Sequence, residues 1–424
     1  MNTAAISHRL RRIPPALLLY LLGIYTLGFT LDGGIFAVLQ NLYLLRLGYG
    51  PEFVGVFNSL GLFVFASLSL PVGTIRRWSG RQMLLSGLVV MWLGSMMIPA
   101  AQYLTDDWRT AALLAGKVIS HVGLAFYFVH AAPFIMGITT GHWQNRALAW
   151  QSAVLNVAGF SGGLLAGYLP GWIAAWLGQT LDDPTPYGLP LFLGAIILLV
   201  TFAAIYRLPD ARPADDDEEE SLRQGQASGQ QRWLGPLWLF VVVLTVVRIL
   251  QVSAPGAVIT FGNVFFDDGL GIATERIGIL AALGKLVSVP MALLVPFLLR
   301  RWGGFNSVMV ISLVSIVATL PLVLSENWII TGVSLVLATA AGPLRYLAFL
   351  VFTMGLVPAG RRALVSGAGE MSIGFGFAAI SFAGGYLIAD YGYATMFTVS
   401  LVATIIGTAL FLLLFGRYRT RKRF

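Results

Sequence analysis

Six ionisable side chains lie within the long apolar stretches of this sequence. An ionisable group in hydrocarbon is costly unless it faces a water-filled cavity or a partner. Each of the six therefore binds a solute, carries a proton or pairs with another charge. The six are Asp32, Lys117, Arg248, Lys285, Arg345 and Glu370.

Positive charge predominates in this set. Four basic and two acidic groups leave a net charge of four minus two, or +2. A low-dielectric pocket with excess positive charge attracts anions, and arginine suits carboxylate or phosphate groups. His121 lies one helical turn beyond the first of the basic residues, on the same face. We therefore predict an organic anion as substrate, with Lys117, His121, Arg248 and Arg345 as the substrate-binding residues.

The two carboxylates, Asp32 and Glu370, are the predicted proton-coupling residues. A carboxylate that meets solvent alternately from the two sides of a membrane can load a proton on one side and release it on the other. His121, which titrates near neutral pH when unperturbed, is a third candidate. The alternative for each residue is a structural ion pair, and Lys285 with Glu370 is the pair expected in that case.

Other chemistries lack the residues that they need. The chain contains no cysteine, which excludes disulfides, thiolate metal sites and cysteine nucleophiles. The four histidines lack metal-ligand spacing with carboxylates, and no glycine-lysine loop suits a nucleotide phosphate. Residues 159–163 fit the G-x-S-x-G hydrolase pattern, but they lie in an apolar stretch without a base and an acid nearby. We therefore predict that the chain is not an enzyme and that it binds no metal and no other cofactor.

The overall composition places these residues in a lipid bilayer. Of 424 residues, 57% are hydrophobic and 11% are charged, and the mean hydropathy is +0.80. Soluble chains carry about 25% charged residues. A spanning helix needs about 20 mostly apolar residues, and twelve stretches meet this requirement. We predict an all-α membrane protein with spans near 16–45, 53–75, 82–102, 109–138, 146–177, 187–206, 234–265, 276–299, 306–324, 328–357, 363–389 and 394–416.

The basic residues predict the orientation of these spans. Twenty Lys and Arg residues lie in the two tails and in alternate loops, and three lie in the opposite loops. Cytoplasmic loops carry such an excess, so both termini are expected in the cytoplasm, with the chain in the plasma or inner membrane. The excess of basic residues therefore does not require nucleic acid as a partner.

The two halves of the sequence repeat one another. Residues 207–232, which include the run DDDEEE, read as a disordered acidic linker between 1–206 and 233–424. Four anchors recur in order across the halves at nearly constant spacing, which is the signature of a duplication. These anchors are 41–61 with 263–284, RRWSG at 76–80 with RRWGG at 300–304, RAL at 146–148 with RAL at 362–364, and GYL at 167–169 with GYL at 385–387.

With these features the sequence resembles the major facilitator superfamily (MFS) of secondary transporters over essentially the whole chain. The signature loop of that family is matched by Gly73, Gly80 and Arg81, whereas Arg77 stands where an acid is usual. The resemblance implies two pseudo-symmetric six-helix halves, a cavity lined by spans 1, 4, 7 and 10, and alternating access. It also implies a cytoplasmic gate loop formed by Gly73, Arg76, Arg77, Gly80, Arg81, Arg300 and Arg301.

Charges and resemblance together predict a secondary active transporter of a small solute, a symporter or antiporter for which protons are the candidate coupling ion. It is expected to function as a monomer in the bilayer. A proton-driven multidrug efflux antiporter is the nearest alternative, favoured by the aromatic content of 12%. A non-transporting membrane sensor is a less favoured one.

Overall fold

The computed structural model describes residues 14–73, 75, 77–139, 144–210, 236–357 and 362–418, and no strand occurs in these ranges. Arg76 and the linker beyond residue 210 lie outside them. The helices of the N-terminal half are α2 (Pro15–Thr30), α3 (Ile35–Arg46), α4 (Pro51–Gly73), α5 (Gly80–Ala100), α6 (Asp106–Gly137), α7 (Gln144–Leu177) and α8 (Thr185–Tyr206). Those of the C-terminal half are α10 (Leu237–Gln251), α11 (Ser253–Val264), the π-helical turn η3 (Phe265–Gly269), α12 (Thr274–Leu324), α13 (Trp328–Ala340), α14 (Gly342–Gly355) and α15 (Arg362–Phe415).

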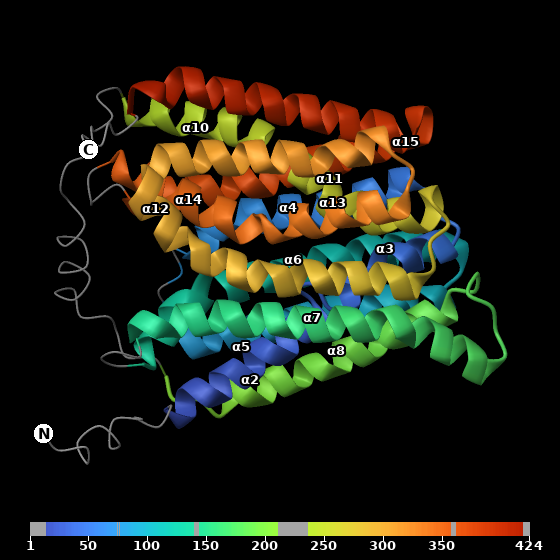
Figure 1. Cartoon of the computed structure of the whole chain (residues 1–424). Helices are drawn as coiled ribbons and strands as arrows, with labels where there is room; N and C mark the ends of the chain where they lie inside the picture. Colours follow the sequence, from blue (N-terminus) through green and yellow to red (C-terminus); the bar gives the residue numbers. More distant parts are fainter. Residues whose placement is uncertain are drawn as a thin grey trace, which may run out of the picture.

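The helical segments of the described residues are consistent with the twelve predicted spans. Ten helical segments in them are long and apolar enough to cross a membrane, and the last of these treats α15 as a single unit. Gly303 and Gly392 interrupt α12 and α15 with φ angles of 75° and 82°, which glycine adopts readily. Figure 1 shows the chain turning back at both places, so each helix has two arms. The second arm of α15 and the first arm of α12, residues 274–302, bring the count to twelve.

Three spans are divided near their middles, and the break in the first span creates the site described below. α2 ends at Thr30 and α3 begins at Ile35, because Gly33 takes a φ of 82°. Pro255 lacks the N–H that would bond to residue 251, where α10 ends, and Pro343 opens α14. The sequence predicts each of these spans as one stretch of about 30 residues, with prolines that can kink two of them, and the break at Gly33 adds to that prediction.

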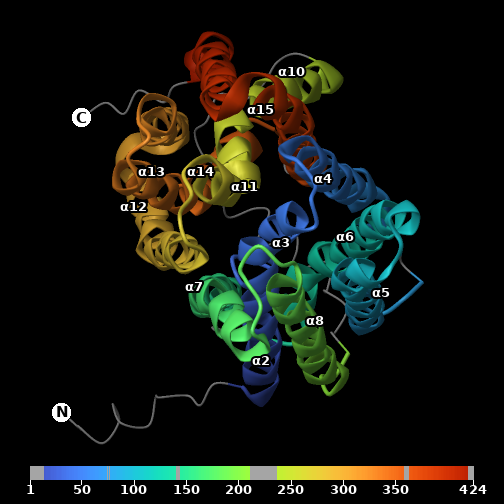
Figure 2. The same ribbon diagram turned by 90° about the vertical axis from the view of Figure 1, so that its right-hand side faces the viewer.

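The halves meet through glycines that occupy equivalent positions in the two repeats. A Cβ placed on Gly55 of α4 would lie 2.9 Å from Cα of Gly385 in α15. A Cβ placed on Gly278 of α12 would lie 2.5 Å from Cα of Gly167 in α7. Gly55 aligns with Gly278 and Gly167 with Gly385 in the sequence repeat, so the contact α4–α15 mirrors the contact α7–α12. Figure 2, which looks along the helices, shows the two pairs on opposite flanks of the bundle.

Asparagine side chains repeat the same symmetry at the centre. Asn41 Nδ2 donates to the backbone oxygen of Thr260, 2.8 Å away in the other half. Its repeat partner Asn263 donates through Nδ2 to the backbone oxygen of Ala37 at 2.9 Å. The reciprocal bonds confirm two pseudo-symmetric halves.

The buried apolar cluster that includes residues of both halves lies at one end of the bundle. We call this the loop end; it carries the turns at 47–50, 178–184 and 270–273. The opposite, termini end is where α2 begins and α15 ends (Figure 1). At the loop end one buried cluster includes residues of both halves, such as Leu42 and Phe261. At the termini end each half has its own cluster. The hydrogen bonds between halves among the described residues also lie from mid-bundle to the loop end.

Candidate substrate cavity

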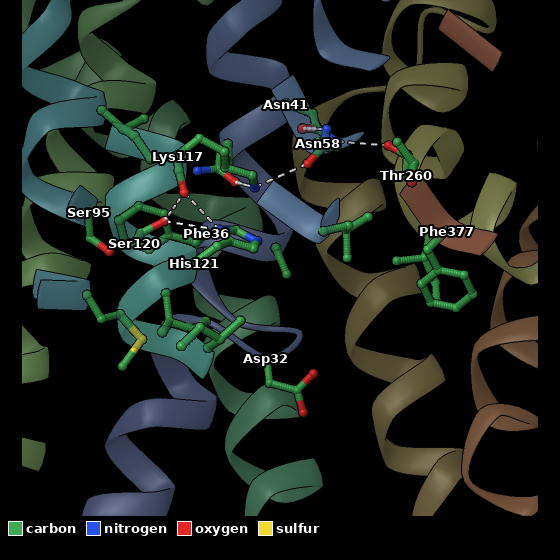
Figure 3. Close-up of a pocket in the computed structure, with 18 of the residues that line it drawn as sticks. Asp32, Phe36, Asn41, Asn58, Ser95, Lys117, Ser120, His121, Thr260 and Phe377 are labelled. Carbon is green, nitrogen blue, oxygen red and sulfur yellow. Dashed lines mark hydrogen bonds between the residues drawn. The ribbon is translucent and has the colours of Figure 1, made fainter. Parts of the chain in front are cut away.

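A cavity of about 390 Å³ lies beside the break in the first span. Most of its wall belongs to α3, α4, α5 and α6 of the N-terminal half. Thr260 of α11 and Phe377 of α15 contribute from the C-terminal half. Figure 3 shows Lys117, His121 and Asp32 around this space, with Phe377 across from them. Three of the residues singled out in the sequence therefore share one cavity.

An ion pair between the halves involves Asp32, one of the residues that line the cavity. Lys285 Nζ of α12 donates to Asp32 Oδ1 at 2.7 Å. The aliphatic part of Lys285 lies against Gly33 and Gly159, where any Cβ would collide with it or crowd it. The pairing of Lys285 with Glu370 that the sequence suggested is therefore wrong. Glu370 instead lies beside the hydroxyl of Tyr346 and near Arg248.

Lys117 is buried in the cavity wall without a carboxylate partner. Its side chain is 6% exposed, and Nζ donates to Gln40 Oε1 at 3.0 Å and to Asn58 Oδ1 at 3.3 Å. The Phe57 ring centroid lies 4.7 Å from Nζ. Two amide oxygens and an aromatic face all favour the ammonium form. No carboxylate forms an ion pair with Lys117 within the described part of the chain.

His121 lies one turn further along α6, next to Lys117. Its Nδ1 lies 3.0 Å from the backbone oxygen of Lys117 and 3.2 Å from Ser120 Oγ. Gly61 of α4 makes room for both side chains, because a Cβ there would lie 2.8 Å from Lys117 Cε and from His121 Nε2. A larger residue at this position of α4 would displace the ends of both side chains.

Arg248 and Arg345 lie in the C-terminal half and do not line this cavity. They are 1% and 7% exposed, and Arg248 Cζ stacks 3.8 Å from the Phe349 ring centroid. Neither Nε has a hydrogen-bond partner among the described residues, and nor does the amide of Gln251, one turn from Arg248. The four predicted substrate-binding residues thus form two separate groups.

The predicted gate loop lies at the termini end. Gly73 ends α4, and Ser79 caps α5 through a reciprocal bond with Gln82, with Gly80 as the first residue of the helix. Arg81 donates to the backbone oxygen of Leu208 at 2.8 Å, which ties this loop to the end of α8. In the second repeat, Arg300 and Arg301 are exposed and directly precede the break at Gly303, and Arg77 is exposed beside the cap.

Sequence reasoning missed the two amides that bind Lys117. Asn58 stands three residues before Gly61 on a span otherwise poor in polar residues, and Gln40 directly precedes the repeat residue Asn41. Isolated amides in apolar spans were the available signal, but the sequence does not give the direction in which such a side chain points. Asn58 also donates to Asn41 Oδ1 at 2.9 Å, which links the cavity to the contact between the halves.

Arg46 makes an ion pair between the halves at the loop end. Arg46 binds both carboxylate oxygens of Asp267 at 2.7 Å, across the halves. Its Nε donates to the backbone oxygen of Leu181 at 2.8 Å, and Tyr187 lies beneath the guanidinium. We call Arg46, Asp267, Leu181 and Tyr187 the clasp. Bidentate pairs of this kind fix geometry as well as contributing energy.

Loss of the clasp is expected to open the loop end. In Arg46→Ala, removal of charge-assisted bonds worth about 1.5–3 kcal/mol should shift the ratio of closed to open molecules by roughly 10–100-fold. Spin labels on Asp182→Cys and Ala273→Cys, in a chain with no other cysteine, report the distance across this end. A longer distance should appear. Arg109→Ala is the control, because Arg109 pairs with Asp106 inside one half. Unchanged distances in Arg46→Ala would show that the clasp does not keep the loop end closed.

Comparisons with known proteins agree with this architecture. The profile of the Major Facilitator Superfamily matches residues 16–369. The crystal structure of the nucleoside transporter NupG is 20% identical, with a TM-score of 0.62 over 96% of this chain and 100% of that one. A bacterial homologue of the human lysosomal transporter Spinster is 15% identical, with a TM-score of 0.68 over 95% of this chain and 96% of that one. The xylose transporter XylE from E. coli is 12% identical, with a TM-score of 0.68 over 96% of this chain and 97% of that one. No curated protein matches by sequence.

Proposed function

Because this chain belongs to the Major Facilitator Superfamily, we propose that it is a secondary active transporter that carries a small organic anion across a membrane by alternating access. The cavity between the halves is the substrate site. The loop end, which is closed, faces away from the cytoplasm, since the basic loops lie at the termini end. The plasma or inner membrane is the expected location.

The observation that carries the anion proposal is the isolated charge of Lys117. Asp32 and Lys285 cancel one another at 2.7 Å, so Lys117 leaves the cavity with one uncompensated positive charge. A buried charge without a counter-ion is costly, and a carboxylate or other anionic group of the substrate supplies the missing partner. This balance favours an anion over the amphiphilic cations typical of drug efflux.

Proton coupling is assigned to Asp32. Protonation of its carboxylate removes the charge that holds Lys285, and this weakens the only ion pair between the halves at mid-bundle among the described residues. Proton binding is thereby linked to the separation of α12 from the first span. Glu370, beside Tyr346 and Arg248, is the second candidate and lies in the other half.

Arg248 and Arg345 are the second group of basic residues that binds the anion. Both lie close to breaks in their spans, and both retain unpartnered N–H groups within the described residues. Movement of α10 and α14 about those breaks would bring the guanidinium groups towards the substrate. They bind the anion after it leaves Lys117.

Uptake into liposomes tests the proposal. Purified protein should accumulate labelled small carboxylates when the pH differs across the membrane, and it should not accumulate the matching neutral amides. Liposomes without protein give the background. Accumulation of amides and carboxylates alike would reject the anion assignment, and stimulation of proton flux by amphiphilic drugs would favour the efflux alternative.

A further inference from the structure

The cavity wall presents an unpaired acceptor beside Lys117. We assign the proton of the neutral ring to Nδ1, which then donates to the backbone oxygen of Lys117, because Ser120 Oγ already donates its own proton to that oxygen. In the neutral ring this leaves Nε2 as an acceptor, and the ammonium of Lys117 opposes a second positive charge so close by. Nε2 has no hydrogen-bond partner among the described residues, and the side chain lines the cavity.

An unpaired donor lies on the other side of Lys117. Gln40 Oε1 accepts from Lys117 Nζ at 3.0 Å, so the amide nitrogen of Gln40 points elsewhere. It has no partner within the described ranges, and Gln40 also lines the cavity. The ammonium of Lys117 and the amide of Gln40 are thus two donors that this wall offers to an anionic ligand.

The acceptor and the cation are close enough for one small ligand to reach both. Lys117 Cε and His121 Nε2 each lie 2.8 Å from the same point, the Cβ position of Gly61. They are thus separated by at most twice that distance. A ligand that bridges them carries its hydrogen-bond donor only one or two carbons from its anionic group.

The donor on the ligand is a hydroxyl and not an ammonium. A ligand ammonium at this place would be repelled by the ammonium of Lys117, and Asp32, the acidic residue that lines the cavity, is bound to Lys285. A neutral imidazole nitrogen suits a neutral hydroxyl. The remaining wall includes Phe36, Phe128 and Phe377, which suit a short carbon chain.

Resting on the anion transport proposed above, we infer that the substrate is a 2- or 3-hydroxycarboxylate. Its carboxylate binds Lys117 and the Gln40 amide, and its hydroxyl donates to His121 Nε2. His121 is thus the residue that determines specificity, because an unhydroxylated acid leaves its acceptor unpaired.

Competition binding with ligands of equal chain length tests this inference. 2-Hydroxybutyrate and 3-hydroxybutyrate are compared with butyrate and with 2-aminobutyrate on the purified full-length protein. At least one hydroxy acid should bind about 5–10-fold more tightly than butyrate, which one neutral hydrogen bond supplies. 2-Aminobutyrate should show no such advantage. In His121→Phe the hydroxy acids should bind no more tightly than butyrate.

His130→Phe is the matched control. His130 lies on the same helix and makes the same bond to the backbone oxygen four residues earlier, at 3.0 Å, but it does not line the cavity. The hydroxyl advantage should survive in this variant. Equal binding of butyrate and both hydroxy acids to the wild type overturns the inference and leaves anion transport standing. An advantage that persists in His121→Phe overturns the role of His121. Binding of neutral amides in preference to all carboxylates rejects anion transport itself.

Discussion

Replacement of Lys117 by methionine is expected to abolish anion uptake. Methionine keeps the length and apolar contacts of the side chain but removes the one uncompensated charge in the cavity. Charge-assisted hydrogen bonds contribute about 1.5–3 kcal/mol each, so carboxylate affinity should fall by roughly 10–100-fold. Uptake of a labelled carboxylate into liposomes measures the loss.

Two controls separate this loss from damage to the fold. Arg109→Met removes a basic residue from the first turn of the same helix, outside the cavity, and should leave uptake unchanged. The thermal midpoint of Lys117→Met should stay close to that of the wild type, since a buried charge without a counter-ion adds little stability. Normal uptake by Lys117→Met would show that the anion binds elsewhere, with Arg248 and Arg345 as the remaining basic candidates.

Replacement of Asp32 by asparagine should uncouple transport from the pH gradient. The amide oxygen of the new side chain can still accept a hydrogen bond from Lys285, but the amide cannot take up a proton. One proton moved across one pH unit supplies about 1.4 kcal/mol, or about tenfold accumulation. This accumulation should disappear in Asp32→Asn, whereas exchange of anion at equal pH on both sides should continue.

The same measurement on Glu370→Gln decides between the two candidate carboxylates. If Asp32 carries the proton, Glu370→Gln retains accumulation driven by the pH gradient. Loss of accumulation in Glu370→Gln, with normal accumulation in Asp32→Asn, would move the coupling site to the C-terminal half.

The fold was predictable because its signals are local and repeated. Apolar stretches long enough to span a bilayer identify the helices, and the repeat of Gly55 as Gly278 and of Gly167 as Gly385 anticipates the two mirrored contacts. Glycine tolerates such close approach of helices, so its position in the sequence carries structural information directly.

The partners within the site were less predictable. A residue's span follows from the sequence, but the direction of its side chain depends on helix rotation, on breaks such as that at Gly33 and on the packing of one half against the other. Lys285 therefore pairs with Asp32 rather than Glu370. The same uncertainty hid Gln40 and Asn58, and it grouped Arg248 and Arg345 with a cavity that they do not line.

Equilibrium binding of one carboxylate and its neutral amide, to wild-type protein and to Lys117→Met, tests the central claim most directly. The wild type should bind the carboxylate at least about tenfold more tightly than the amide, a difference of about 1.4 kcal/mol. In Lys117→Met the two affinities should become similar through loss of carboxylate binding alone. Equal affinities in the wild type, or a preference for the carboxylate that survives without Lys117, would contradict the account.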